Sequence, residues 1–98
     1  MTKAFNESEI QEAMTSLTQS GWNYSESSKA ITKVFKFKNF IDAMGWLIKV
    51  GMTAEKLNHH PEIKNSYNRV EILLTTHDAG GLTEKDIHLA TLIDKLNR

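Results

Sequence analysis

The 98-residue chain contains no cysteine, and this absence excludes a disulfide framework, a thiolate nucleophile and a thiolate metal site. It has one proline, no apolar run near the roughly 20 residues that span a bilayer, and no apolar signal core at its start, MTKAFNESEI. Its 12 basic and 12 acidic side chains cancel, and neither sign is concentrated in one stretch. We therefore expect a cytoplasmic protein that neither enters a membrane nor binds nucleic acid directly.

The composition is that of an ordinary globular domain. Hydrophobic residues make up 40% of the chain and charged residues 24%, which excludes the disordered and fibrous classes. Two separate cores would each bury too little apolar surface at this length, so residues 1–98 are expected to form a single domain. A core this small favours self-association as an additional source of stability.

The first half of the chain predicts a helix followed by a β-hairpin. Asn6 and Glu9 have the spacing of a capping box, and apolar residues then recur at helical intervals, which predicts a helix over residues 6–21. A short strand is expected at 22–25, and a turn rich in serine separates it from a second strand at 29–37, whose apolar residues alternate.

The second half predicts a longer helix, one or two strands and a last helix. The helix should run over 39–60, because Pro61 disfavours helical geometry in the residue before it. Alternating apolar residues predict a strand over 67–76, with a short partner around Ile63, and a last helix is expected over 83–96. The order α-β-β-α-β-β-α predicts an α+β fold: a four-stranded antiparallel sheet with three helices on one face.

The apolar faces of the second and the last predicted helix indicate how each helix packs. In the helix over 39–60 the polar residues form only a narrow stripe, so this helix is expected to be mostly buried. In the last helix, which opens with a Thr83 and Asp86 capping box, the apolar arc is wider than one sheet can cover. We expect a second copy of the chain to bury the excess on the last helix.

A cluster of ionisable residues lies at the end of the second helix. Glu55 and His59 are four apart, so in a helix both project from one face, away from the polar stripe, and the carboxylate can orient the imidazole. His60 points elsewhere, and His77 follows directly after the strand over 67–76. Imidazoles exchange protons near neutral pH, so the cluster indicates acid–base chemistry on a small molecule.

Two other interpretations of these residues remain open. Histidines at the end of a helix can simply cap its free carbonyls and interact with its dipole. Alternatively, Glu55, His59, His60 and His77 offer three or four zinc ligands, although two histidines spaced H-x-x-x-H, the helical metal pattern, are absent.

Beyond these local patterns, the stretch from Glu55 to Ala90 resembles the pterin-4a-carbinolamine dehydratases. That family's pattern has an acidic residue, three positions, His-His-Pro, a tyrosine, a strand ending in Thr-His, a glycine, and Asp-Ile-x-Leu-Ala at the start of the last helix. The matching residues are Glu55, His59, His60, Pro61, Tyr67, Thr76, His77, Gly81, Asp86, Ile87, Leu89 and Ala90. Ile63 departs from the pattern, because relatives usually carry an aromatic residue there.

The resemblance implies an enzyme that removes water from 4a-hydroxytetrahydrobiopterin and so recycles tetrahydrobiopterin, without a metal or an organic cofactor. It implies catalysis by Glu55, His59, His60 and His77, with His60 and His77 also binding the pterin ring. Thr76, His77 and Asp78 follow the strand over 67–76, where backbone groups no longer engaged in the sheet are expected to hydrogen-bond the substrate. The resemblance also implies a homodimer or a homotetramer in which dimers join through helices. The alternative it offers is a protein-binding module, because some members act as dimerisation cofactors of a homeodomain transcription factor.

Overall fold

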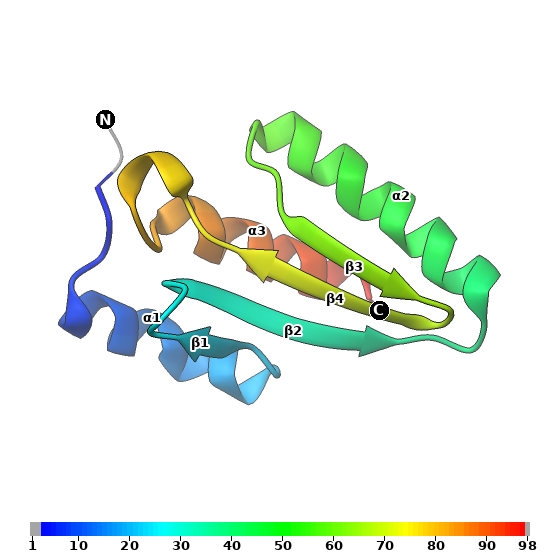
Figure 1. Ribbon diagram of the computed structural model, residues 1–98, viewed down its shortest axis with the longest axis horizontal. Helices are drawn as coiled ribbons and strands as arrows, with labels where there is room; N and C mark the ends of the chain where they lie inside the picture. Colours follow the sequence, from blue (N-terminus) through cyan, green and yellow to red (C-terminus); the bar gives the residue numbers. More distant parts are fainter. Residues whose placement is uncertain (1–2, 98) are drawn as a thin grey trace.

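The computed structural model of the protein describes residues 3–97, and its elements follow the predicted order (Figure 1). The helices and strands are α1 (Glu7–Gln19), β1 (Asn23–Ser25), β2 (Ala30–Lys36), α2 (Phe40–Leu57), β3 (Glu62–Ser66), β4 (Arg69–Leu74), the single 3-10 turn η1 (His77–Ala79) and α3 (Glu84–Leu96).

Side chains at the helix starts fix where the helices begin. Both predicted capping boxes are present: the pair Asn6 and Glu9 opens α1, and the pair Thr83 and Asp86 opens α3. α2 ends earlier than predicted, at Leu57, because Asn58 adopts the left-handed conformation as its C-cap. The two histidines at 59 and 60 therefore lie outside the helix, and this changes the site described below.

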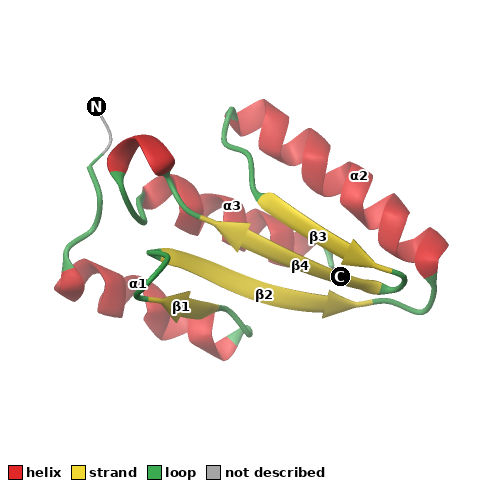
Figure 2. Cartoon of the chain, viewed as in Figure 1, coloured by secondary structure: helices red, strands yellow, loops and turns green. Residues whose placement is uncertain are grey.

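The four strands form one antiparallel sheet in the order β1-β2-β4-β3 (Figure 2). β2 and β4 occupy its centre, with Phe35 opposite Val70 and Ile31 opposite Leu74. β3 is the short strand expected around Ile63, and it forms an exposed edge along its whole length. The predicted α+β class, strand number and element order are confirmed.

The hydrophobic core lies between one face of the sheet and the helices. Trp46 of α2 packs on Phe35 of β2, with ring centroids 4.5 Å apart. Asp94 of α3 reaches the same sheet face, where it accepts hydrogen bonds from Lys33 Nζ at 2.7 Å and Trp22 Nε1 at 3.0 Å. Buried apolar residues of α1 join this core, so all three helices contribute to one layer.

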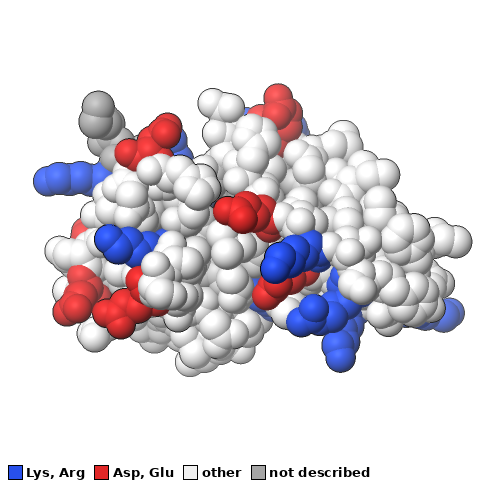
Figure 3. Space-filling model, in the orientation of Figure 1, with Lys and Arg blue, Asp and Glu red and all other residues white. Residues whose placement is uncertain are grey.

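The opposite face of the sheet carries no helix, and Figures 1 and 3 look onto it. Lysine and arginine side chains alternate there with acidic ones, so no area of a single charge covers this face (Figure 3). Glu71 of β4, for example, lies between Val34 of β2 and Lys64 of β3 in the sheet register. Charges of both signs are therefore interspersed over this face of the sheet (Figure 3).

The prediction that α2 is mostly buried is wrong. Its buried residues are only Ala43, Trp46, Val50 and Ala54. Ile41, Ile48 and Met52 have relative exposures of 78%, 62% and 67%. The narrow polar stripe is not the only solvent-facing side, because α2 lies along the edge of the helix layer and contacts the rest of the chain over a small arc (Figure 2).

The prediction of excess apolar surface on the last helix is also wrong. Leu89, Ala90 and Ile93 of α3 are buried, and Ile87, Leu92 and Leu96 are half-buried. α3 packs against both α2 and the sheet, so one chain covers its wide apolar arc. The uncovered apolar face belongs to α2.

Across residues 3–97 the helices all fall short of the length and apolar character that a bilayer span requires. The cytoplasmic location stays a prediction.

Candidate active site

A cavity of about 330 Å³ opens where α2, β4 and α3 come together. It is lined by Asn58, His59, His60, Thr75, Thr76, His77, Asp78 and Lys85. Its volume lies at the lower end of the range of small-molecule sites. The structure thus brings five predicted site residues to one cavity, namely His59, His60, Thr76, His77 and Asp78, while Ile63 is not among the residues that line it.

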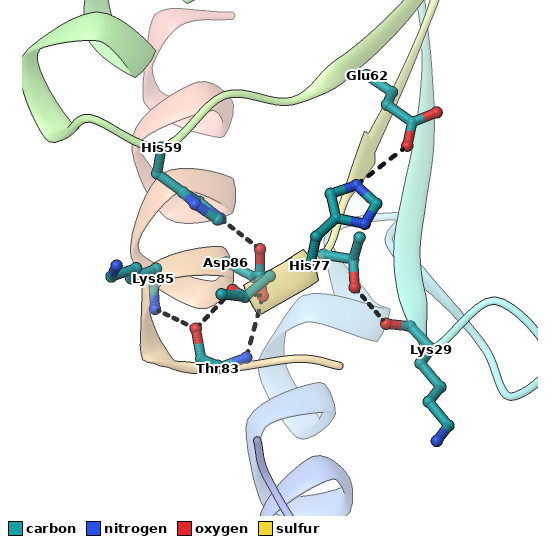
Figure 4. Close-up of polar contacts among 9 residues, drawn as sticks. Lys29, His59, Glu62, His77, Thr83, Lys85 and Asp86 are labelled. Carbon is teal, nitrogen blue, oxygen red and sulfur yellow. Dashed lines mark hydrogen bonds and ion pairs between the residues drawn. The ribbon is translucent and has the colours of Figure 1, made fainter. Parts of the chain in front are cut away.

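His59 is held by a carboxylate that comes from a different helix. Its Nε2 lies 2.6 Å from Oδ1 of Asp86, the third residue of α3, and Figure 4 shows the ring pointing at that side chain. The histidine side chain is 10% exposed and Asp86 is fully buried. A contact this short, shielded from water, fixes the plane of the ring.

Asp86 is itself held by two further polar groups. Its Oδ2 accepts hydrogen bonds from the Thr76 hydroxyl at 2.8 Å and the Thr83 backbone N–H at 3.0 Å. The hydroxyls of Thr76 and Thr83 lie 2.8 Å apart, and both residues are buried. The bond from the Thr83 N–H is one half of the capping box, so a single carboxylate caps α3 and orients a cavity histidine.

The prediction that Glu55 orients His59 is wrong. Glu55 Oε1 instead lies 2.8 Å from His60 Nε2, and both side chains are exposed, at 79% and 57%. The prediction assumed that residue 59 still belonged to the helix, where positions four apart face the same side. The helix ends at Leu57 with Asn58 as its C-cap, so the chain turns before residue 59 and the His59 side chain points toward α3. Glu55 does not line the cavity.

His77 stands on the other side of the cavity, at the start of η1. Its Nε2 lies 3.6 Å from Oε2 of Glu62 on β3, and Figure 4 shows the ring turned toward that carboxylate. Both side chains are largely exposed, so water screens this pair. Of the three imidazoles, only the one at 59 has a buried partner.

Asp86 is a site residue that the sequence patterns do not reveal, although its capping role is visible in them. Its spacing from Thr83 gave it a complete structural role as a capping residue, and no local pattern shows that its second oxygen faces a histidine 27 positions earlier. Asn58 and Lys85 also line the cavity, but no sequence pattern marks either residue as part of a site.

The zinc interpretation needs three or four ligands around one point. Among residues 3–97, no three histidine, cysteine or acidic side chains are grouped closely enough to hold a metal ion. The carboxylates instead pair with separate imidazoles, Asp86 with His59 and Glu55 with His60.

With this geometry in view, the chain can be compared with known proteins. The model of the family described as pterin 4 alpha carbinolamine dehydratase matches residues 3–96. The chain belongs to this family. A dehydratase-family relative from Jannaschia sp. (strain CCS1) is 45% identical over 96 residues, which covers 98% of each chain. Another from Rhizobium etli is 53% identical over 75 residues, 76% of this chain and 74% of the relative.

A solved structure extends the comparison to three dimensions. The crystal structure of a protein from Brucella melitensis, described as a transcriptional coactivator/pterin dehydratase, is similar with a TM-score of 0.90 and 42% identity. The similarity covers 96% of this chain and 98% of the other. The resemblance of the sequence to the pterin-4a-carbinolamine dehydratase family is thereby confirmed, and it extends over the whole fold.

Proposed function

We propose that this chain catalyses the dehydration of 4a-hydroxytetrahydrobiopterin to quinonoid dihydropterin and water. The single observation that carries this proposal is the cavity of about 330 Å³ lined by three histidines, one of them fixed by a buried carboxylate. Family membership supports the same reaction class.

The reaction needs two proton movements and nothing more. The bond between C4a and the hydroxyl oxygen breaks, and the departing oxygen takes up a proton to leave as water. The ring N5–H gives up its proton, and a C4a=N5 double bond forms, so that protons balance without an oxidant or reductant. Histidines exchange protons near neutral pH, and two of them on one substrate supply both movements.

We assign acid–base work to His59, with Asp86 behind it, and to His60, with Glu55 behind it. His77 contacts the substrate ring and shares in binding with His60 and Asp78, whereas the predicted binding residue Thr76 supports this wall of the cavity without contacting the substrate. The hydroxyl of Thr76 is occupied by Asp86 and its backbone is paired with Gly81, so binding at this wall falls to the N–H groups of His77 and Asp78. Donors at the start of a helical turn have no partner within it and are free for a pterin carbonyl.

Stopped-flow absorbance with chemically generated 4a-hydroxytetrahydrobiopterin tests this function. We expect the protein to accelerate dehydration over the spontaneous rate, and addition of a chelator to leave the acceleration unchanged. Loss of activity with the chelator would contradict metal independence. The variants His60→Ala and His77→Ala should both be slower, and rates equal to the unmutated protein would remove those residues from the site.

We also propose that the chain forms a homo-oligomer through α2. The exposed residues Ile41, Ile48 and Met52 follow one face of the helix, and this is the largest apolar area that α2 leaves uncovered. Gly45 and Gly51 support close approach of a partner, since a Cβ at either position would meet nothing within 4 Å in this chain. Glycine inside a helix costs about 1 kcal/mol relative to alanine, and no contact within the chain explains that cost.

The oligomeric state can be measured by sedimentation velocity. Ile48→Glu should shift the protein to a smaller species, because it places charge in the centre of the proposed interface. Val34→Glu, which adds the same charge on the open sheet face, serves as the matched control and should leave the assembly intact. An unmutated chain that stays monomeric would contradict self-association and leave the α2 face to a different protein, as in a coactivator role.

A further inference from the structure

A continuous chain of hydrogen bonds runs behind His59, away from the cavity. It begins at the backbone N–H of Lys85, which donates to Thr83 Oγ1 at 3.2 Å (Figure 4). It continues through the Thr83 and Thr76 hydroxyls to Asp86 Oδ2. Thr76, Thr83 and Asp86 are all buried. The other oxygen of the same carboxylate, Asp86 Oδ1, lies 2.6 Å from His59 Nε2.

The position of each proton in this chain follows from counting donors. A threonine hydroxyl has one proton, and that of Thr76 is given to Asp86 Oδ2. The contact between the two hydroxyls therefore uses the proton of Thr83, whose oxygen still accepts from the Lys85 N–H. Both threonine protons thus point along one direction, toward the carboxylate.

Asp86 consequently receives two donors on one of its oxygens, Oδ2. Oδ2 accepts from the Thr76 hydroxyl and the Thr83 N–H, and donors of this kind stabilise the anionic form of a carboxyl group. An anionic carboxylate has no proton to give to His59, so the short contact at Oδ1 requires a proton on Nε2 of the imidazole. In a neutral imidazole, the other nitrogen then carries a lone pair.

We infer that Thr76 and Thr83 are positioning residues that hold Asp86 as an anion, fix His59 as its Nε2–H tautomer and leave Nδ1 as the proton acceptor of the cavity. Nδ1 of His59 makes no hydrogen bond within residues 3–97, while the residue lines the cavity. The catalytic part of this inference rests on the proposed dehydratase function; the tautomer does not.

This assignment gives the two neighbouring histidines opposite roles. His59 takes the N5 proton of the pterin on Nδ1, and the resulting imidazolium is stabilised by Asp86. His60, whose Nε2 lies 2.8 Å from Glu55 Oε1 at the exposed side of the cavity, supplies in its protonated form the proton that leaves with the hydroxyl as water. His59 then returns its proton to solvent and His60 regains one from it, so both start the next cycle unchanged.

The decisive test reads the tautomer directly by long-range ¹⁵N–¹H correlation NMR, with the His59 signals assigned through His59→Gln. The unmutated protein should show a protonated Nε2 and an unprotonated Nδ1 in the neutral ring. Thr76→Val removes one donor from Asp86 and should introduce the Nδ1–H tautomer, whereas Thr76→Ser, which keeps the hydroxyl, should retain the Nε2–H form. The signals of His60 should not change in either variant.

Kinetics supply the second readout. Thr76→Val should lower kcat about tenfold or more, the effect of losing one hydrogen bond to a charged group, with KM changed less than about twofold. The matched control Thr91→Val removes a threonine hydroxyl from the exposed side of α3, where it bonds only the Ile87 carbonyl, and should leave kcat unchanged. Thr83→Val should act like Thr76→Val, with an added loss of stability from the lost cap.

The outcomes separate this inference from the proposed function. A single Nε2–H tautomer in Thr76→Val, with kcat equal to that of the unmutated protein, would reduce the threonine chain to a structural role and overturn the inference. An Nδ1–H tautomer in the unmutated protein would overturn it as well. Absence of dehydratase activity in the unmutated protein would instead defeat the proposed function, and the NMR result would stand independently.

Discussion

His59 and His60 are adjacent in the sequence and opposite in environment. The side chain of His59 is 10% exposed and meets the fully buried Asp86, whereas that of His60 is 57% exposed and meets the largely exposed Glu55. The two contact distances, 2.6 and 2.8 Å, are nearly the same. Distance alone therefore does not rank these pairs, because water screens the second pair far more than the first.

Removing the buried carboxylate of Asp86 should have the largest effect, because only the His59 side of the comparison depends on it. Asp86→Ala leaves His59, Thr76 and the start of α3 without their shared acceptor. We expect the free energy of unfolding to fall by about 3 kcal/mol, the typical loss when one partner of a buried pair is removed. Urea denaturation followed by circular dichroism measures this loss.

The isosteric Asp86→Asn variant separates folding from orientation. It keeps the volume and an acceptor for the α3 cap, so it should lose less stability than the alanine variant while kcat drops about 100-fold. An asparagine variant with undiminished kcat would show that the charge behind His59 is not needed for the reaction.

Replacing the two histidines in turn is the next largest test. Both His59→Gln and His60→Gln should lower kcat by at least about 100-fold if each moves a proton in the reaction. Only His59→Gln should also lower the melting temperature, because it alone disturbs a buried polar network. Equal melting temperatures for the two variants would contradict the difference in environment.

The turn that separates the two rings can be tested at Asn58. This residue has φ of 52° and ψ of 42°, a conformation that β-branched side chains rarely adopt. Asn58→Val should therefore lower the free energy of unfolding by about 1–2 kcal/mol. Asn58→Gly, which adopts the same backbone freely, is the control and should be as stable as the unmutated protein in the same denaturation experiment.

The smallest effect is expected at the exposed pair. Glu55→Gln should change kcat less than about threefold, because a surface ion pair contributes little in water. The difference from the unmutated protein should vanish in high salt, which screens exposed charges. A large loss of kcat in Glu55→Gln that persists in high salt would show that this carboxylate contributes to the reaction as much as Asp86 does.

The fold was predictable because its signals are local. Two capping boxes and the alternation of apolar residues in β2 and β4 each fix an element without reference to the rest of the chain. The cavity histidines were found through their residue type and through resemblance to the family. The pairing between them and the carboxylates was not predictable, because it depends on where α2 ends and on how α3 packs beside it.

Burial of the helices could not be read from their sequences for a similar reason. The apolar arcs of α2 and α3 are both wide, and only the layer geometry decides which of them is covered. α3 lies behind the sheet and is covered on most sides, while α2 lies at the margin (Figure 1). Sequence alone gives the width of an apolar face and not the identity of its neighbour.

The two tryptophans lie in different environments, so their fluorescence should report on different events in the molecule. Trp22 is fully buried and its indole N–H is bound to Asp94, so its fluorescence should report only on global unfolding. Trp46 lies within α2, and its Nε1 is a buried donor without an acceptor in the part of the chain that the structure describes. Emission from that second indole should therefore respond when the packing of α2 on the sheet changes, which allows this contact to be followed at low concentration without attaching a dye.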